Sequence, residues 1–201
     1  MKWNLKSVTK ETNHPFLNFY TLHYEVEKDS KKKPYDYFMA SRHEKEDLLP
    51  LSKSPKQPDG VTIPCYYLDE KGNISFLLTK QFRPAIGSIV YSVPAGLLDS
   101  NDESVLSVAK REAIEEAGAV LTDLEVLAPS GTLSSGLSDE TNAIVLGRIV
   151  FFEEKKLEEF EDIETSLVPR EELEAMLKDP SYFFSCTARL LFLYLLLRFP
   201  K

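Results

Sequence analysis

The chain has 201 residues, of which 43% are hydrophobic and 28% charged, a composition typical of a soluble globular protein with one substantial domain, or one domain and a small appendage. Acidic residues outnumber basic ones by 32 to 24, and the formal net charge is −8. This acidity argues against a non-specific nucleic-acid binder, which usually presents a basic face. It does not exclude a small phosphorylated substrate, because a metal ion and a few arginines offset acidity locally.

The chain ends predict no targeting or membrane segment. The N-terminus is polar and lacks the apolar core of a signal peptide, and the most apolar run, residues 190–197, is shorter than the roughly 20 residues of a bilayer span. We therefore expect a cytoplasmic protein without a membrane partner, in which residues 190–197 form part of a helix packed on the core. Cys65 and Cys186 lack metal-ligand spacing, and we expect free buried thiols rather than a disulfide.

The first 60 residues predict a β-hairpin and a linker. Two alternating runs, LNFYTLHYEVE and YDYFMAS, flank the charged turn EKDSKKKP, a pattern typical of a hairpin. The stretch 51–60 is rich in Pro, Ser and Lys, which predicts a linker or surface loop.

Strands and helices are mixed in the rest of the chain. Strands are expected in VTIPCYYLDE and ISFLLTKQFR, on either side of a turn at 71–73, and in SIVYSVPAG, LEVLAP, NAIVLGRIVFF and IETSLVP. Residues 102–117 predict a helix, because apolar residues recur at helical spacing and Gly118 follows. Further helices are expected at 170–179 and at about 185–198. This order predicts an α/β or α+β core with mixed sheets and flanking helices.

Three glutamates share one face of the helix predicted at 102–117. Glu115 and Glu116 lie three and four residues after Glu112, which brings their Cβ atoms to about 5–6 Å from that of Glu112. Carboxylates at that distance raise one another's pKa values, and a divalent cation removes the conflict. Hard oxygen ligands suit Mg²⁺, or alternatively Mn²⁺, and no histidine or cysteine lies nearby to suggest zinc. The alternative is a helix face that simply meets solvent.

Two features beside the helix favour the metal site. A predicted strand and the turn Pro94-Ala95-Gly96 precede the helix and can direct backbone carbonyls, such as that of Ala95, toward the same metal. Arg111 lies eight residues after Glu103, about two helical turns, where a glutamate that orients an arginine or holds a second metal fits.

The segment Glu103-x7-Arg111-Glu112-x2-Glu115-Glu116-x-Gly118 resembles the Nudix box, G-x5-E-x7-R-E-U-x-E-E-x-G-U, in which U is aliphatic. Every charged position matches, whereas six residues instead of five separate Gly96 from Glu103. The resemblance implies a Nudix α/β/α sandwich with a mixed sheet. It also implies metal ligation by Glu112 and Glu116 with Glu115 beside them, a contribution from the Ala95 carbonyl, and a catalytic role for Arg111.

Two stretches are similar to the ADP-ribose and nucleotide-sugar pyrophosphatases. Lys80-Gln81-Phe82-Arg83-Pro84 is similar to the stretch before the box in that subfamily, which implies contact of Arg83 with the diphosphate or terminal ribose. SSGLSDE, residues 134–140, resembles the loop S-P-G-x-S-(D/N)-E that shapes the substrate pocket, with Ser135 in place of proline. That change weakens the assignment to ADP-ribose, and Gly96, Ser135 and Glu140 are expected at the substrate.

The strand at 36–42 looks like one that in this subfamily usually carries a tryptophan and ends in arginine. Tyr37 takes the tryptophan's place and is expected to stack on a base, the alternative being that it only packs within its own sheet, and Arg42 is expected to reach phosphate. The resemblance implies an N-terminal β-domain at 1–55, which builds a homodimer and completes the pocket, and a Nudix hydrolase domain at 56–201.

The implied reaction is Mg²⁺-dependent attack of water on a diphosphate, with ADP-ribose giving AMP and ribose 5-phosphate as the leading case. The alternatives are another nucleotide sugar, a dinucleotide cofactor, or a Nudix-like ligand-binding protein without catalysis. The subfamily's general base is a glutamate on a mobile loop before a strand, which implies Glu161 in the acidic loop 153–164, with Glu158 and Glu159 close by. A small nucleoside diphosphate derivative is the expected partner, and no nucleic acid.

Overall fold

The chain folds as two units in a computed structural model that describes residues 1–52, 57–99 and 104–200. The first unit consists of Met1–Asp59 and Ser130–Asn142, and the second of Gly60–Pro129 and Ala143–Lys201. The expected boundary between residues 55 and 56 lies in the stretch 53–56, outside the described residues. The participation of 130–142 in the first unit was not expected, because it joins segments about 90 residues apart in the sequence.

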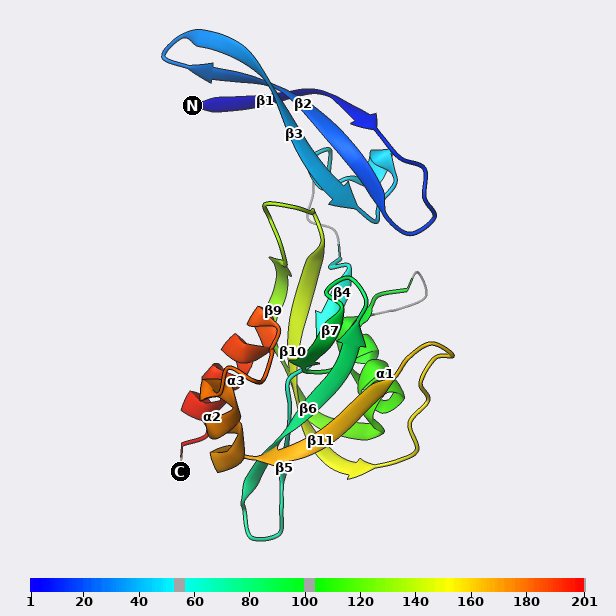
Figure 1. Ribbon diagram of the computed structural model, residues 1–201, viewed down its shortest axis with the longest axis vertical. Coiled ribbons are helices and arrows are strands. Elements are labelled where there is room, and N and C mark those ends of the chain that lie inside the picture. The colour runs from blue at the N-terminus through cyan, green and yellow to red at the C-terminus, as the bar shows by residue number, and fades with distance from the viewer. Residues whose placement is uncertain (53–56, 100–103, 201) are drawn as a thin grey trace. The chain divides into compact units, whose positions relative to one another are not determined.

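An antiparallel sheet in the order β1-β2-β3 forms the N-terminal unit (Figure 1). Its strands are β1 (Lys2–Lys10), β2 (Asn18–Lys28) and β3 (Lys31–Ser41). The predicted hairpin is β2-β3, and Asp29 and Ser30 turn it with φ angles of 51° and 60°, as a tight two-residue turn requires. The first strand, β1, was not predicted, because its alternation is hidden by polar residues and interrupted by a register shift between Leu5 and Ser7.

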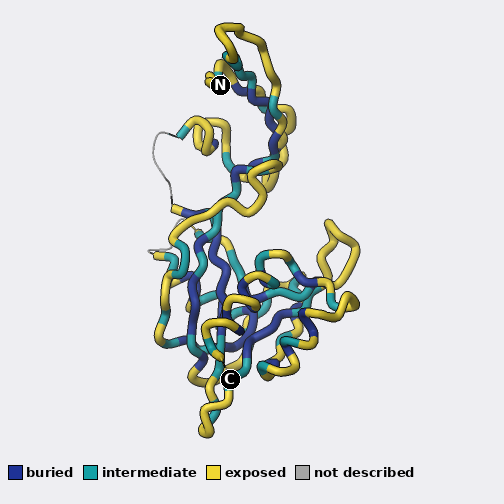
Figure 2. The backbone as a smooth tube through the Cα atoms, turned by 90° about the vertical axis from the view of Figure 1, so that its left-hand side faces the viewer, coloured by how far each residue is buried: buried dark blue, intermediate teal, exposed yellow. Residues whose placement is uncertain are grey.

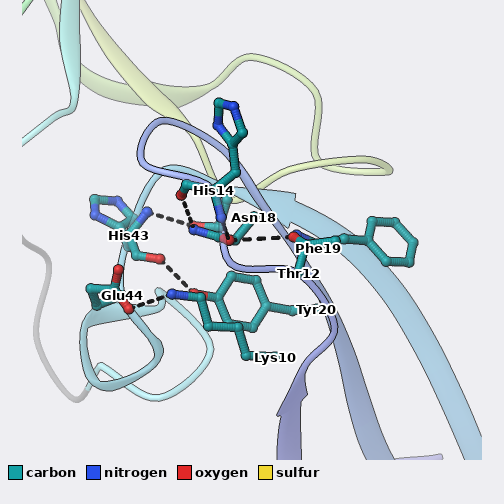
Figure 3. A network of polar contacts seen from close by, with 9 residues as sticks. Lys10, Thr12, His14, Asn18, Phe19, Tyr20, His43 and Glu44 are labelled. Atoms are coloured by element: carbon teal, nitrogen blue, oxygen red, sulfur yellow. Dashed lines mark hydrogen bonds and ion pairs between the residues drawn. The ribbon is translucent and has the colours of Figure 1, made fainter.

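Polar contacts hold the segments that follow β1 and β3 in the N-terminal unit (Figure 3). The Tyr20 hydroxyl donates to the His43 carbonyl oxygen at 2.8 Å, and Lys10 Nζ donates to Glu44 at 2.7 Å. These bonds fix the chain from β3 toward the short helix η1 (Lys45–Asp47). The small apolar core of this unit consists of Val8, Tyr20, Leu22, Met39 and Leu48.

An eight-stranded mixed sheet forms the second unit, in the order β11-β6-β5-β10-β4-β8, with β7 on β6 and β9 on β10. The pair β5/β10 is parallel, while β6 is antiparallel to β5, β7 and β11. The strands are β4 (Gly60–Thr62), β5 (Cys65–Leu68), β6 (Ile74–Arg83), β7 (Ser88–Ser92), β8 (Ala95–Leu97), β9 (Ala119–Thr132), β10 (Thr141–Phe152) and β11 (Ile163–Pro169).

Prolines divide two of the predicted strands. Pro64 separates β4 from β5, and Pro94 separates β7 from β8, since proline has no N–H to donate to a neighbouring strand. The second break matters for the site, because it places Ala95 and Gly96 on a strand of their own beside β4.

Helices cover both faces of this sheet, as expected for an α/β/α sandwich (Figure 1). On one face α1 (Val105–Ala117) packs with Leu77 of β6, and on the other α2 (Arg170–Lys178) and α3 (Cys186–Arg198) pack with Phe76 and Leu78. Neighbouring residues of β6 therefore serve opposite cores, which explains its continuous apolar run. Figure 2 shows the buried residues concentrated along the strands of this unit.

The apolar run at 190–197 lies in α3, which packs on the core as expected. No helix in the described part of the chain is long and apolar enough to cross a membrane. Both cysteines are free, and Cys65 is buried as expected. Burial was wrong for Cys186, which is exposed because it begins α3 on the side away from Ala188 and Leu191.

Candidate active site

The helix α1 carries the three expected glutamates and is capped at both ends. The Ser104 hydroxyl accepts a hydrogen bond from the Ser107 N–H, and the Ser107 hydroxyl accepts one from the Ser104 N–H, which forms a capping box. Gly118 ends the helix with φ 65°, a left-handed conformation that favours glycine. Residues 100–103 lie outside the described residues. They include the expected first helical residues, 102 and 103, the glutamate of the box at Glu103, and most of the loop between Gly96 and Glu103 that is one residue longer than the Nudix pattern.

One side of α1 is apolar, and the edge beside it carries the carboxylates. Val108, Ala109 and Ala113 are fully buried against the sheet. Glu116 follows the same side and is only 7% exposed, while Glu115 is partly exposed. A glutamate as buried as Glu116 is rare in proteins unless it has a partner.

Strand β8 meets these carboxylates with its backbone. The Ala95 N–H donates to Glu116 Oε2 at 3.2 Å. Gly96 lies directly under Glu112, since a Cβ atom at Gly96 would come within 1.9 Å of the Glu112 carboxyl carbon. The glycine expected at the substrate thus also makes room for a metal-ligand candidate, because any other residue would displace the carboxylate.

The carboxylates of Glu112 and Glu116 resist ionisation. Burial raises the pKa of Glu112 to about 7, assisted by the charges of Glu115 and Glu161 and opposed by Arg111. Burial also raises the pKa of Glu116 to about 8, assisted by Glu112 and Glu161 and opposed by the Ala95 N–H and Arg83. A buried carboxylate and a partly buried one side by side fit a positive ion, which would favour their charged forms.

Arg111 ties this cluster together. Its Nη1 atom donates to Glu112 Oε1 at 2.7 Å and to Glu115 Oε2 at 3.1 Å, and its Nη2 atom donates to the Leu97 carbonyl oxygen at 3.2 Å. The guanidinium therefore joins α1 to β8 and orients two carboxylates at once.

The donor set fits a divalent cation that takes few ligands from the protein. Within residues 1–52, 57–99 and 104–200, no group of three or more His, Cys, Asp or Glu side chains is gathered as a metal site. Glu112 and Glu116 are two hard oxygen donors, and Mg²⁺ is usually bound by one or two carboxylates together with waters and substrate phosphates.

The charges of Arg83 and Glu161 also act on the carboxylates of α1. Arg83 ends β6, is exposed, and its charge acts on Glu116. Glu161 lies in the loop before β11, and its charge acts on both Glu112 and Glu116. Glu158 and Glu159 are exposed in the same loop.

The remaining expected residues lie together in the N-terminal unit. The Tyr37 hydroxyl donates to the Gly136 carbonyl oxygen at 3.0 Å, and Ala40 N–H donates to the Leu137 carbonyl oxygen at 2.9 Å, so that residues 134–138 run beside β3. Arg42 Nε lies 3.6 Å from Glu140 Oε1, and Ser135 lines a cavity beside Tyr37.

Trp3 and Asp139 also line this cavity, but the sequence did not predict them as site residues. Trp3 is the only tryptophan in the chain, and this alone could have marked it as a candidate for binding a ligand. Asp139 was seen only as part of the loop motif, and its burial depends on contacts with residue 49 that no local pattern reveals.

Comparison with known proteins places these features in a family. The NUDIX domain matches residues 58–185, which is more than half of the chain. A Caenorhabditis elegans protein named "Putative nudix hydrolase 2" is 32% identical over 88 residues, 44% of this chain and 39% of that protein, so the aligned part spans well under half of its length. A solved structure described as that of an ADP compounds hydrolase has a similar fold, with a TM-score of 0.70 and 17% identity over 98% of this chain and 94% of the other. The chain belongs to the Nudix hydrolase family.

Proposed function

We propose that this protein hydrolyses the diphosphate bond of a nucleoside diphosphate derivative with the help of Mg²⁺, and that ADP-ribose, giving AMP and ribose 5-phosphate, is its substrate. The observation that carries the proposal is the pair of carboxylates, the buried Glu116 and the partly buried Glu112, against the backbone of β8. The fold similarity to a protein described as an ADP compounds hydrolase agrees with this substrate class.

In this proposal Glu112 and Glu116 hold the metal, with the Ala95 carbonyl and Glu115 beside them. When bound, a divalent cation supplies positive charge that offsets the negative charge of the diphosphate. Arg111 keeps Glu112 and Glu115 in place through its two hydrogen bonds. Positioning and charge carry the catalysis, because phosphoryl transfer needs little covalent chemistry from the protein.

Two side chains of the second unit act on the reacting groups. Arg83 offers a guanidinium to the diphosphate oxygens. Glu161 accepts the proton of the attacking water. Its Oε2 atom accepts a hydrogen bond from the Glu158 N–H at 3.1 Å, so that Oε1 is the oxygen that takes the proton.

The substrate's nucleoside part lies with Tyr37, Arg42, Ser135 and Glu140 of the N-terminal unit, and Gly96 lies near the diphosphate. Tyr37 stacks on the base, and Arg42, which forms an ion pair with Glu140, is left with further N–H groups that can bind phosphate. We further propose that this unit forms a homodimer, supported by the stacked and exposed pair Phe19 and Phe38, whose ring centroids are 6.2 Å apart. A cytoplasmic location is part of the same proposal and is tested by cell fractionation.

A coupled assay tests the reaction. The purified chain is incubated with ADP-ribose and Mg²⁺, and a phosphatase then releases phosphate from the products alone. Turnover that depends on Mg²⁺ and is lost in Glu116→Gln is expected. A panel of nucleotide sugars and dinucleotides, compared by kcat/KM, decides between ADP-ribose and the alternatives. Binding of ADP-ribose without turnover of any compound would instead indicate a ligand-binding protein.

A further inference from the structure

The N-terminal unit contains a cavity of about 460 Å³, within the size range of small-ligand pockets. It lies on one face of the sheet β1-β2-β3, where Trp3, Tyr24 and Tyr37 line it together with residues of the segment 130–142. All of its lining residues belong to this one unit.

Aromatic rings form part of the walls of the cavity. Trp3 packs edge-on against Tyr24, with ring centroids 5.5 Å apart and an interplanar angle of 85°. Tyr37 is fixed by the hydrogen bond from its hydroxyl to the Gly136 carbonyl oxygen. Ring walls of this kind favour a planar aromatic occupant, since such rings gain from stacking and from edge-to-face packing.

A buried carboxylate with one unsatisfied oxygen lines the same cavity. Asp139 is 6% exposed, and its Oδ2 atom accepts a hydrogen bond from the Leu49 N–H at 3.0 Å. Its Oδ1 atom is buried and has no hydrogen-bond partner in the described part of the chain. An unsatisfied buried carboxylate oxygen is costly, and a donor supplied by an occupant of the cavity would remove that cost.

We propose that Asp139 determines the base specificity of the protein: the cavity receives the base of the nucleotide, and Asp139 Oδ1 accepts a hydrogen bond from an exocyclic amino group. A base with an amino group, such as adenine, is then preferred over hypoxanthine, which carries a carbonyl oxygen at the same position. The carbonyl would face a carboxylate oxygen, and neither can donate. This inference rests on the proposed function, because it concerns the base of the same nucleotide substrate.

The expected preference follows from the strength of one hydrogen bond. A hydrogen bond to a charged group contributes enough for a discrimination of about 10- to 100-fold. The wild-type protein is therefore expected to bind AMP at least about 10-fold more tightly than IMP.

Asp139→Asn tests the assignment by reversing it. The amide oxygen still accepts the Leu49 N–H, because an amide NH₂ cannot, and the NH₂ group then takes the place of Oδ1. The variant presents a donor where the wild type presents an acceptor, so that it should bind IMP more tightly than AMP. The two side chains have nearly the same shape, and tight binding of IMP would itself show that the variant is folded.

Trp3 supplies the measurement, because it is the only tryptophan and lines the cavity. The full chain is titrated with AMP and with IMP in metal-free buffer, and the Trp3 fluorescence gives a Kd for each. Asp36→Asn is the matched control, since it removes the same charge from this unit, at a residue that pairs with His23 and does not line the cavity.

The proposal is supported if the wild type prefers AMP, Asp139→Asn prefers IMP, and Asp36→Asn behaves as the wild type. It is overturned if Trp3 responds equally to both nucleotides or to neither, if Asp139→Asn keeps the wild-type ratio, or if Asp36→Asn shifts the ratio as much as Asp139→Asn does. AMP and IMP contain no diphosphate bond, so this result is independent of turnover. Absence of ADP-ribose hydrolysis together with a reversed AMP/IMP preference would reject the reaction and keep the base assignment.

Discussion

Gly96 and Glu112 are in direct contact across the space between β8 and α1, and the contact leaves no room for a side chain at Gly96. Gly96→Ala should therefore displace the Glu112 carboxylate and lower kcat/KM for ADP-ribose by about 100-fold, as small displacements of catalytic groups do. The thermal midpoint should change little, because Glu112 can move toward solvent. Gly131→Ala is the control, since nothing lies within 4 Å of its added Cβ atom. Equal activity of the two variants would contradict this account of Gly96.

Glu116→Gln should separate metal binding from folding. The glutamine keeps the shape of the buried side chain, and its amide oxygen can still accept the Ala95 N–H. We expect kcat/KM to fall by at least about 100-fold, the upper range for groups that only support a metal ligand. Mg²⁺ should raise the thermal midpoint of the wild type, because a ligand of the folded state stabilises it, but not that of the variant. A variant that Mg²⁺ still stabilises would exclude Glu116 as a ligand.

The sequence predicted the elements of this site better than its contacts. Helical spacing places Glu112 and Glu116 on one face of α1, and that prediction needs only local geometry. The contact of Gly96 with Glu112 depends on the pairing of β8 with β4, which is fixed by distant segments. The same holds for Asp139, whose burial arises only when the segment 130–142 joins the N-terminal unit. Long-range pairing is therefore the part that the sequence alone could not provide.

Asp59 should give the N-terminal unit a pH-dependent stability. Burial acts to raise the pKa of Asp59, but hydrogen bonds from His43 and Thr141 outweigh it and hold the pKa below its usual value. A carboxyl group with a lowered pKa in the folded state stabilises the protein above its unfolded pKa of about 3.9, and the contribution is lost as the pH falls through the lower folded value. Urea unfolding should therefore show a loss of stability below about pH 4 that is smaller in Asp59→Asn.

The control for Asp59 is Asp29→Asn in the same unit, which removes the same charge at a turn where asparagine also adopts the positive φ. This variant should retain the wild-type dependence on pH. If Asp59→Asn lost as much stability below about pH 4 as the wild type, Asp59 would make no such contribution.

Phe38→Glu should dissociate the proposed homodimer. Phe19 and Phe38 are 42% and 56% exposed, and a charge placed between their stacked rings would have to be desolvated in an interface. Light scattering is expected to give a dimer for the wild type and a monomer for the variant. Leu197→Glu is the control, since Leu197 is 82% exposed on α3 of the second unit. A wild-type monomer with full activity, or dissociation by Leu197→Glu alone, would reject this interface.

Glu161→Gln should affect the chemical step and leave the loop intact. The loop turns at Glu158, whose carbonyl oxygen accepts the Glu161 N–H at 3.0 Å and whose N–H donates to Glu161 Oε2. A glutamine oxygen can keep the second bond, so that the turn persists while proton acceptance at Oε1 is lost. Because a general base contributes about 10²- to 10⁴-fold, kcat should fall by that factor with little change in KM or in the Mg²⁺ requirement.

The neighbouring glutamates make this prediction specific to Glu161. Glu158 and Glu159 are exposed, whereas the charge of Glu161 is among those that raise the pKa values of both Glu112 and Glu116. Glu158→Gln and Glu159→Gln should therefore retain most of the wild-type kcat. Turnover is measured for all three variants from pH 6 to 9 at saturating Mg²⁺. Wild-type rates in Glu161→Gln throughout that range would show that Glu161 is not the proton acceptor, and Glu115 and Glu140 would be the next residues to replace.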